Sequence, residues 1–299
     1  RDRTDTLESM IIKMYSKGIT TREIADLVER MYGDYYSPTT VSNITKQVGN
    51  LVEEFHDRTF KHSQYVCVFL DATYIPLKRG TVEREAVNIA IGIRSDGGKE
   101  VLDFSVAPNE NGEAWRELLE SLRNRGIEQV QLFIADGFIG LENVIAEIYP
   151  TAKFQRCLVH VLRNLTSHVR KSDMRDLMSE FKEIRQSESL EEAKRALDNF
   201  ILKWKSKYSN QMRKLGKLSN LFTFYEFPPS IRASIYSTNL IEAFNKKLKK
   251  KIRQKEQFPN EDALQRFVTT QILEYNDKFE ERAHRGFRGS KDTLDSMFI

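Results

Sequence analysis

The fold class follows from the stretch between residues 65 and 71. It is a continuous apolar run that ends in an acid, Tyr65-Val66-Cys67-Val68-Phe69-Leu70-Asp71. An apolar run of this length is typical of a strand that is buried on both faces of a sheet. The pattern recurs further along the chain, again with an acid at its end, in Val130-Gln131-Leu132-Phe133-Ile134-Ala135-Asp136. We therefore expect two buried strands that each end in an aspartate.

The segments around these two strands alternate between strand and helix patterns. Strands are expected at residues 85–94, 100–106 and 153–157, with a hairpin turn at Asp96-Gly97-Gly98. Helices are expected at residues 112–125, 139–148 and 158–171. The resulting order is β-β-β-α-β-α-β-α, a mixed sheet with helices on both faces. This is the order of the ribonuclease-H-like fold.

The first sixty residues carry only helical patterns. Thr20 or Thr21 is expected to cap one helix, and Ser37 to cap another that begins at Pro38. Three short helices with tight joints resemble a helix-turn-helix DNA-binding unit, although small helical bundles without a DNA function show the same pattern. The side chains expected to face DNA are Thr39, Thr40, Ser42, Asn43 and Lys46.

The remainder of the chain is also expected to be helical. Two helices cover residues 237–254 and 260–281, and they precede a tail that we expect to be loose. The expected organisation is a helix-turn-helix region at 1–60, the first part of an α/β core at 61–171, a helical insertion at 172–230, and the second part of the core at 231–299.

The composition excludes several classes of protein. The chain has 299 residues, of which 40% are hydrophobic and 30% are charged. No apolar run approaches the ~18 residues of a membrane span, and no signal peptide opens the chain. Two cysteines do not make a disulfide framework, so the composition favours a reducing compartment.

Positive charge is concentrated in one part of the chain. The formal net charge is only +4, but residues 161–260 carry 22 basic and 11 acidic side chains, a net charge of +11. Two runs in this block contain no acid, at residues 203–217 and 246–255. One lysine run is more often a solvated helix face, whereas two in one block favour nucleic acid as a partner. In the second run we expect DNA contacts from Lys246, Lys247, Lys250 and Lys251.

Three acids are candidates for a metal site. The first and fourth strands lie side by side in this order of elements, so Asp71 and Asp136 are expected to approach each other. Oxygen ligands without a thiolate or imidazole partner suit a hard cation such as Mg²⁺ or Mn²⁺. Glu242 would be the third ligand, because it is the only acid between Glu226 and Glu256 in a strongly basic stretch.

Simpler explanations exist for these acids. Aspartate often ends a strand because it favours turns, and Asp136-Gly137 alone is typical of a turn. Glu242 could pair with Lys246 on the surface of its helix, a contact of a few tenths of a kcal/mol (about 0.2–0.5).

Several stretches occur together in the order found in one known family. They are Thr21-Arg22-Glu23-Ile24, Tyr32-Gly33, Ser37-Pro38-Thr39-Thr40-Val41-Ser42, Phe69-Leu70-Asp71-Ala72, Ala135-Asp136-Gly137, Gln155-Arg156-Cys157-Leu158-Val159-His160, Arg163-Asn164 and Ser237-Thr238-Asn239-Leu240-Ile241-Glu242. From about residue 4 to residue 282 the chain resembles the Mutator-type transposases of bacterial insertion sequences. The resemblance implies a DDE transposase in which Asp71, Asp136 and Glu242 form the catalytic and metal-binding triad.

The resemblance also implies partners and a location. The partner would be double-stranded DNA, as transposon ends, flanking DNA and target DNA, and a homodimer is expected because two ends must be brought together. The location would be the bacterial cytoplasm, at the nucleoid. Members of the family are usually longer at the N-terminus and this chain opens on Arg1, so we expect part of a longer protein.

The family carries a Cys-x-x-His sequence, which is Cys157 and His160 in this chain. A structural zinc site needs four ligands, and the other cysteine, Cys67, lies inside the first strand, so zinc is disfavoured. We expect His160 and Arg163 to face the active site and to contact the scissile phosphate or flanking DNA. Of the two tryptophans, Trp115 is expected in the core, and Trp204 either stacks on an unpaired base or packs within the insertion.

The expected reaction is two-metal-ion phosphoryl transfer. Two Mg²⁺, or Mn²⁺ as a substitute, would activate water to free a 3′-hydroxyl, which would then attack another DNA strand. Two alternatives remain from the residues. One is a nuclease of the same fold, such as a junction resolvase, that cleaves without joining. The other is a non-catalytic DNA-binding regulator derived from a transposase.

Overall fold

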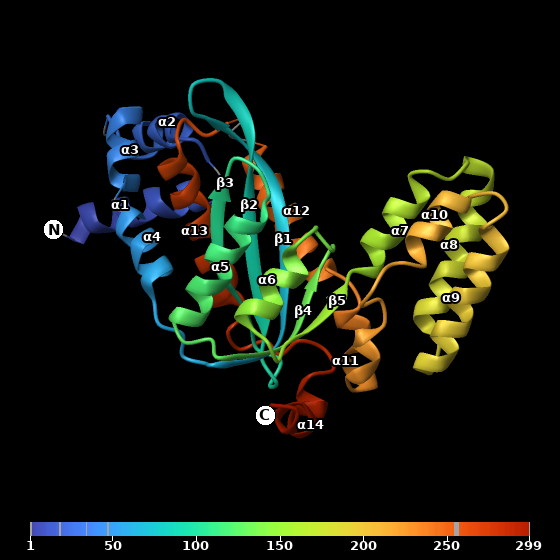
Figure 1. The fold of residues 1–299 in the computed structure, drawn as a ribbon. Coiled ribbons are helices and arrows are strands. Elements are labelled where there is room, and N and C mark those ends of the chain that lie inside the picture. Colours follow the sequence, from blue (N-terminus) through green and yellow to red (C-terminus); the bar gives the residue numbers. More distant parts are fainter. Residues whose placement is uncertain (1, 18, 34, 47, 254–256, 299) are drawn as a thin grey trace.

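The computed structural model describes residues 2–17, 19–33, 35–46, 48–253 and 257–298. In this part of the chain a five-stranded mixed sheet has the order β3-β2-β1-β4-β5 (Figure 1). The β1–β2 and β2–β3 pairs are antiparallel, whereas β1–β4 and β4–β5 are parallel. The strands are β1 (Gln64–Lys78), β2 (Val82–Ile93), β3 (Lys99–Ala107), β4 (Gln129–Ala135) and β5 (Lys153–Arg156).

The expectation that the first strand ends at Asp71 is wrong. Strand β1 continues to Lys78, because its antiparallel neighbour β2 keeps pairing with it as far as Lys78↔Val82. The parallel neighbour β4 stops much earlier, and its last pair with β1 is Phe69↔Ile134. Asp71 therefore lies inside a strand, just beyond the point where β4 leaves the sheet.

Side chains on the two faces of the sheet pack into two separate hydrophobic cores. On one face, Leu70 and Phe133 pack with α5 (Gly112–Asn124) and α6 (Leu141–Ile148), where Trp115 is fully buried as expected. On the other face, Phe69 and Ile134 pack with α12 (Asn239–Ile252) and α13 (Glu261–Phe279). Figure 1 shows the sheet between these two helical layers.

The N-terminal helices form a unit against α13. Thr20 caps α2 through a reciprocal capping box with Glu23, and the Ser37 hydroxyl accepts the amide of Thr40 at 3.0 Å at the start of α3. The Tyr15 hydroxyl donates to the Ala263 carbonyl at 3.3 Å. A fourth helix, absent from the sequence expectation, follows the three predicted ones. The four are α1 (Asp2–Ser16), α2 (Thr21–Tyr32), α3 (Pro38–Lys46) and α4 (Val48–Asp57).

Helices fill the chain between β5 and α12. Figure 1 shows α7 to α10 on one side of the sheet and α1 to α4 on the other. The expected helix after residue 158 ends at Thr166, because Arg170 has an extended backbone and begins a new helix. The elements are α7 (Leu158–Thr166), α8 (Lys171–Gln186), α9 (Leu190–Trp204), α10 (Ser209–Leu215), the 3₁₀ turn η1 (Thr223–Glu226) and α11 (Pro229–Ile235).

Trp204 packs within these helices. Its side chain is 5% exposed, lies beside Phe200 and Tyr208, and donates its indole N–H to Glu180 at 3.1 Å. The first basic run is partly neutralised nearby, since Lys203 pairs with Glu180 at 2.7 Å and Lys207 with Asp173 at 3.1 Å. Of the two expectations for Trp204, the structure favours packing over base stacking.

The expectation of a loose tail is wrong. The tail forms η2 (Arg288–Ser290) and α14 (Lys291–Ser296), and Phe287 and Leu294 are fully buried. The buried amide of Gln131 donates to the Leu294 carbonyl at 2.8 Å. The buried side chains of Phe287 and Leu294 and this hydrogen bond to β4 hold the tail in place. Its glycine and arginine content had predicted mobility.

Within the described residues, no helix has the length and apolar character needed to cross a membrane.

The close packing of β2 against Tyr65 is testable. A methyl group added at Gly92 would lie 2.6 Å from a ring carbon of Tyr65, which is fully buried. We expect Gly92→Ala to lower the free energy of unfolding by about 1–3 kcal/mol in urea denaturation. Gly112→Ala is the control, because its methyl group would meet no atom within 4 Å. Equal effects of the two substitutions would contradict this packing.

Candidate active site

Asp71 and Asp136 each follow the last residue pair between β1 and β4. The last β1–β4 pair is Phe69↔Ile134, and each aspartate follows two residues later on its own chain. Side chains alternate along a strand, so Asp71, like Phe69, is directed to the face that carries α12. Asp136 also begins a turn, in which its carboxylate accepts the amide of Phe138 at 3.0 Å. The turn that the simpler explanation expects at Asp136 is therefore present, and it does not exclude a role at the active site.

The carboxyl group of Asp71 is half-buried and lies near other carboxylates. Asn245 of α12 donates its side-chain amide to Asp71 Oδ2 at 2.8 Å. Burial is the main cause that raises the pKa of Asp71 from 3.8 to about 6. The Asn245 bond and the charge of His160 lower this pKa, whereas the carboxylates of Asp136 and Glu242 raise it. The three acids thus interact electrostatically.

Glu242 is held by residues from α7 and from its own helix. Arg163 donates to Glu242 Oε2 at 2.8 Å, and the Thr238 hydroxyl oxygen lies 3.2 Å from Oε1. The His160 Nε2 atom lies 3.7 Å from Oε1. Burial raises the pKa of Glu242, but the bond and charge of Arg163 outweigh it, so the net shift is downward. The simpler explanation for Glu242 requires an ion pair with Lys246. In the structure Glu242 pairs with Arg163 instead.

Cys157 fastens the start of α7 to the start of α12. Its buried Sγ accepts the amide and the hydroxyl of Thr238, both at 3.2 Å, and Thr238 Oγ1 lies 3.2 Å from His160 Nδ1. Burial raises the pKa of Cys157, but hydrogen bonds from His160 and Thr238 outweigh it and lower the pKa. The hydrogen bond to Cys157 is the main cause that raises the pKa of His160.

Two sets of side chains could hold a metal ion. The ligand atoms of Cys157, His160 and Glu242 all lie within 4.8 Å of one another. Their polar atoms are already hydrogen-bonded to Thr238 and Arg163, so this set forms a network that orients Glu242.

The second set offers oxygen atoms. Asp71 and Glu242 line a cavity of about 490 Å³, together with Thr73 and Asn245. Thr73 Oγ1 and Asn245 Oδ1 are buried and have no hydrogen-bond partner among the described residues. Orphaned buried oxygens are rare, and carboxylate, hydroxyl and amide oxygens are the donors that Mg²⁺ and Mn²⁺ prefer. This donor set fits a hard divalent cation.

The triad expected from the sequence is only partly assembled. Asp136 does not line the cavity. Among the described residues, the carboxylates of Asp71, Asp136 and Glu242 are not all within the 4.8 Å that separates the ligand atoms of Cys157, His160 and Glu242. Glu242 itself is held toward α7 by Arg163 and His160.

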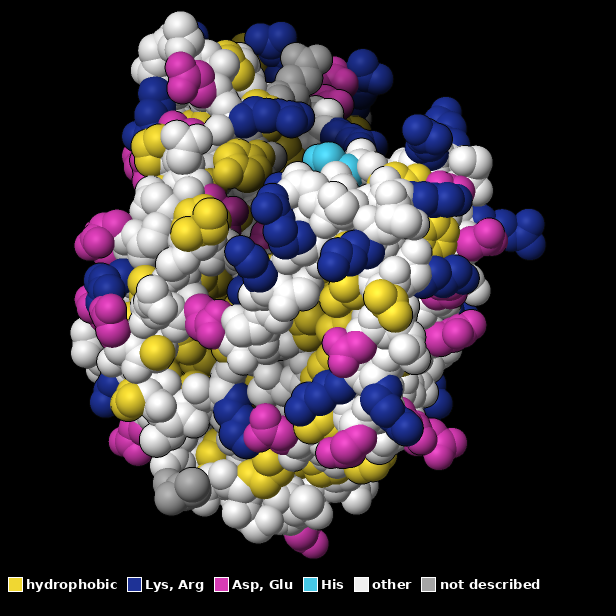
Figure 2. Space-filling model, turned by 45° about the vertical axis from the view of Figure 1, so that its right-hand side comes forward, with side chains coloured by type: hydrophobic (Ala, Val, Ile, Leu, Met, Phe, Trp, Pro, Cys, Tyr) yellow, Lys and Arg dark blue, Asp and Glu magenta, His cyan; other side chains and the backbone are white. Residues whose placement is uncertain are grey.

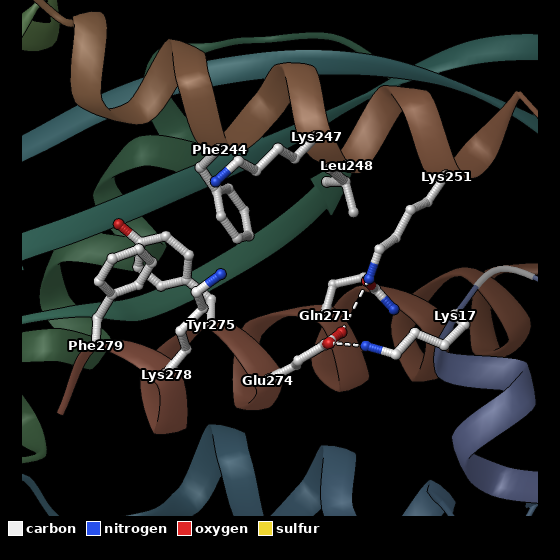
Figure 3. Close-up of a pocket in the computed structure, with 10 residues that line it drawn as sticks. All are labelled: Lys17, Phe244, Lys247, Leu248, Lys251, Gln271, Glu274, Tyr275, Lys278 and Phe279. Atoms are coloured by element: carbon white, nitrogen blue, oxygen red, sulfur yellow. Dashed lines mark hydrogen bonds and ion pairs between the residues drawn. The ribbon is translucent and has the colours of Figure 1, made fainter.

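Cations surround the cavity on the α12 side. Figure 2 shows Lys and Arg side chains gathered around a hollow, with acidic side chains partly visible inside it. Of the expected DNA contacts, His160, Arg163, Lys246 and Lys250 line this cavity. Lys247 and Lys251 instead face α13 in a separate groove (Figure 3).

Several residues of the cavity were missed by the sequence analysis. Asn245, Lys249 and Arg253 follow Glu242 by three, seven and eleven residues, a spacing that places them on one helix face. This signal was available in the sequence. Thr73 gave none, because its role depends on an unpaired hydroxyl that only the structure reveals.

The helix-turn-helix candidates lie far from this cavity. Thr39, Thr40 and Asn43 are exposed on α3, and Ser42 is half-buried there. The side chain of Lys46 lies outside the described residues. Figure 1 shows α3 across the sheet from α7.

The buried charge of Asp71 has a measurable cost. A carboxyl whose pKa is raised from 3.8 to about 6 stabilises the fold while protonated, and this stabilisation is lost as the pH rises between those values. We expect Asp71→Asn to raise the free energy of unfolding of the metal-free chain by about 1–3 kcal/mol at pH 8, and to change it little at pH 4. Urea denaturation in EDTA measures both.

The exposed Asp198→Asn on α9 is the control for this prediction, and it should change stability by less than about 0.5 kcal/mol at either pH. An Asp71→Asn effect that is the same at pH 4 and pH 8 would show that the charge of Asp71 costs nothing.

Comparison with known proteins identifies the family. The sequence matches the Mutator family of transposases over residues 1–282. It is 50% identical over 296 residues to the transposase for insertion sequence element IS905 of Lactococcus lactis subsp. lactis, covering 99% of this chain and 75% of that relative. It is 51% identical over 276 residues to the transposase for element IS1201 of Lactobacillus helveticus, covering 92% and 74% of the two chains.

A more distant relative supports the same assignment. The transposase for element IS256 in transposon Tn4001 of Staphylococcus aureus is 27% identical over 276 residues, covering 91% of this chain and 71% of that relative. The resemblance noted in the sequence is confirmed, and the chain belongs to the Mutator family of transposases.

Proposed function

We propose that the chain is a DDE transposase that cleaves the ends of its own DNA element and joins the freed 3′-hydroxyl to another DNA strand. One observation carries the proposal. Asp71 of β1 and Glu242 of α12 line a single cavity whose walls also hold Lys246, Lys249, Lys250 and Arg253. Asp136 directly follows β4, the parallel neighbour of β1. Acids within a ring of cations suit metal-assisted chemistry on a phosphodiester.

The sheet supports a ribonuclease-H-like assignment. A hairpin pair, a third antiparallel strand and two parallel additions give the order β3-β2-β1-β4-β5. In this proposal residues 61–171 and 231–299 form the catalytic core, and residues 172–230 form an insertion. Residues 1–60 form a helix-turn-helix region that reads DNA sequence through α3.

A divalent cation, when bound, would supply activation of the attacking oxygen and stabilisation of the leaving oxygen. Asp71, Asp136 and Glu242 would hold it, and the orphaned oxygens of Thr73 and Asn245 lie in the same cavity as Asp71 and Glu242. Asp71 is mostly ionised only above about pH 6, because its pKa is raised to that value. The donor set therefore favours a cation at neutral pH.

The basic side chains would bind and orient the DNA. Lys246 and Lys250 are exposed on the cavity side of α12, where they can contact backbone phosphates. The Arg163 side chain is 56% exposed while it pairs with Glu242, so its guanidinium is accessible to a phosphate. Thr238 and Cys157 fix the orientation of His160 beside Glu242. Joining two ends requires two active sites, which favours a homodimer.

Loss of any one acid should abolish the chemistry and spare DNA binding. We expect Asp71→Asn, Asp136→Asn and Glu242→Gln each to lower the rates of end cleavage and strand transfer by at least about 100-fold. DNA affinity in EDTA should stay within about threefold, because the cations of α12 remain. A labelled duplex that carries the element's ends, incubated with Mg²⁺, reports both steps.

Asp198→Asn is the control for these variants and should retain full activity. Retained cleavage by Asp136→Asn would refute the triad. Cleavage by the unaltered chain without joining would indicate a nuclease such as a resolvase, and DNA binding without cleavage would indicate a regulator.

His160 should contribute to the reaction beyond its hydrogen bond to Thr238. We expect His160→Ala to slow cleavage and strand transfer by about 10- to 100-fold while DNA affinity in EDTA is unchanged. His168→Ala, an exposed histidine just beyond α7, is the control. Wild-type rates for His160→Ala would disprove a role for this residue at the active site.

A further inference from the structure

The groove between α12 and α13 has two electrostatically different ends (Figure 3). At one end, Lys17 and Lys251 both pair with Glu274, and Lys251 also bonds to Gln271. At the other end, the ammonium groups of Lys247 and Lys278 lie near aromatic rings without a dashed contact. Both lysines at the first end have a carboxylate partner, whereas among the described residues Lys247 and Lys278 at the second end have none.

Three positive charges surround one aromatic ring at the second end. The Lys99 Nζ atom is 4.2 Å from the centroid of Phe279, and the charged groups of Lys278 and Arg282 are each 5.9 Å from it. In the part of the chain that the structure describes, no carboxylate forms an ion pair with these three residues or with Lys247. The ring supplies only a weak attraction for so much charge.

The cations repel one another. Burial is the main cause that lowers the pKa of Lys99, and the charges of Lys247 and Arg282 lower it further. Like charges in a half-buried site cost free energy unless a counter-charge is present. The cluster is therefore suited to an external anion.

A cavity of about 350 Å³ opens beside this cluster. Lys99 and Lys247 line it together with Ser237, which is 1% exposed and whose hydroxyl has no hydrogen-bond partner among the described side chains and backbone. A buried hydroxyl without a partner is uncommon, and it can donate to an anion that enters the cavity.

The start of α12 adds positive potential to this cavity. Asn239 and Leu240, in the first turn of α12, are part of the lining. No side chain caps this helix, since the Thr238 hydroxyl is committed to Cys157 and Glu242. The amide groups of an uncapped first turn favour an anion.

We propose that this cavity binds a backbone phosphate of DNA, and we call it the second phosphate site. Lys99, Ser237 and Lys247 line it, and Lys278 and Arg282 add positive charge beside Phe279, which also lines it. It lies on the opposite side of α12 from the active-site cavity, so the phosphate belongs to a DNA segment outside the active site. The inference rests on the proposed function, because DNA is the source of the phosphate.

The test is DNA affinity in EDTA, measured by fluorescence anisotropy at several KCl concentrations with the full chain. We expect Lys99→Ala/Lys247→Ala to weaken binding by about tenfold and to reduce the slope of log affinity against log salt by about 1, the value for one lost phosphate contact. Lys17→Ala is the matched control, since Lys17 lies in the same groove but is paired with Glu274, and it should change neither quantity.

Ser237→Ala separates a built site from a diffuse positive surface. It removes no charge, so we expect about threefold weaker DNA binding with an unchanged salt slope. Its thermal stability should be no lower than that of the unaltered chain, because the buried hydroxyl that it removes has no partner among the described residues. Unchanged affinity in this variant would overturn the hydrogen bond from Ser237.

Two further arms separate the outcomes. If Lys246→Ala/Lys250→Ala weakens DNA binding and Lys99→Ala/Lys247→Ala does not, the second phosphate site is wrong and the proposed function stands. If neither pair weakens it, the proposed binding of DNA by the two positive surfaces of α12 is wrong as well. Titration with inorganic phosphate, followed by calorimetry, identifies the source: saturable binding that Lys99→Ala/Lys247→Ala abolishes, without any loss of DNA affinity, would assign the site to free phosphate and overturn the assignment to DNA.

Discussion

The site depends on how helix α12 is held against the sheet. Two contacts fix it: the Thr238 amide and hydroxyl donate to the buried Cys157 sulfur, and Asn245 donates to Asp71 at 2.8 Å. The first contact joins α12 to the segment that leaves β5, and the second joins it to the middle of β1. Because Thr238 and Asn245 are both fixed, Glu242, which lies between them on α12, is directed into the cavity.

Charge in the cavity is balanced locally but incompletely. Arg163 and His160 compensate Glu242, whereas among the described residues half-buried Asp71 has an amide and no cation as its hydrogen-bond donor, and burial raises its pKa to about 6. The oxygens of Thr73 and Asn245, which have no hydrogen-bond partner among the described residues, add further unsatisfied negative potential to the cavity. Buried oxygen atoms without hydrogen-bond donors are free to coordinate a cation. Without a cation they lower the stability of the fold.

Sequence patterns predicted the sheet well because buried strands have a strong apolar signature. All five strands occur where expected, yet the end of β1 was wrong, since only the pairing partner β2 determines how far that strand continues. The packed tail was missed because Phe287 and Leu294 are isolated apolar residues in a polar context. The oxygens of Thr73 and Asn245 could not be predicted, because an unsatisfied hydrogen bond is a property of three-dimensional packing.

The lysine run at residues 246–251 shows why charge along a sequence is not charge on a surface. Successive residues of a helix point about 100° apart, so a continuous run cannot form one patch. Lys246, Lys249 and Lys250 line the active-site cavity, whereas Lys247 and Lys251 face α13. On that second side Lys251 pairs with Glu274, whereas Lys247 has no carboxylate partner among the described residues and lies near the charge of Lys99. One helix therefore carries two positive surfaces, and a DNA partner that contacts both must pass around α12 rather than along a single face.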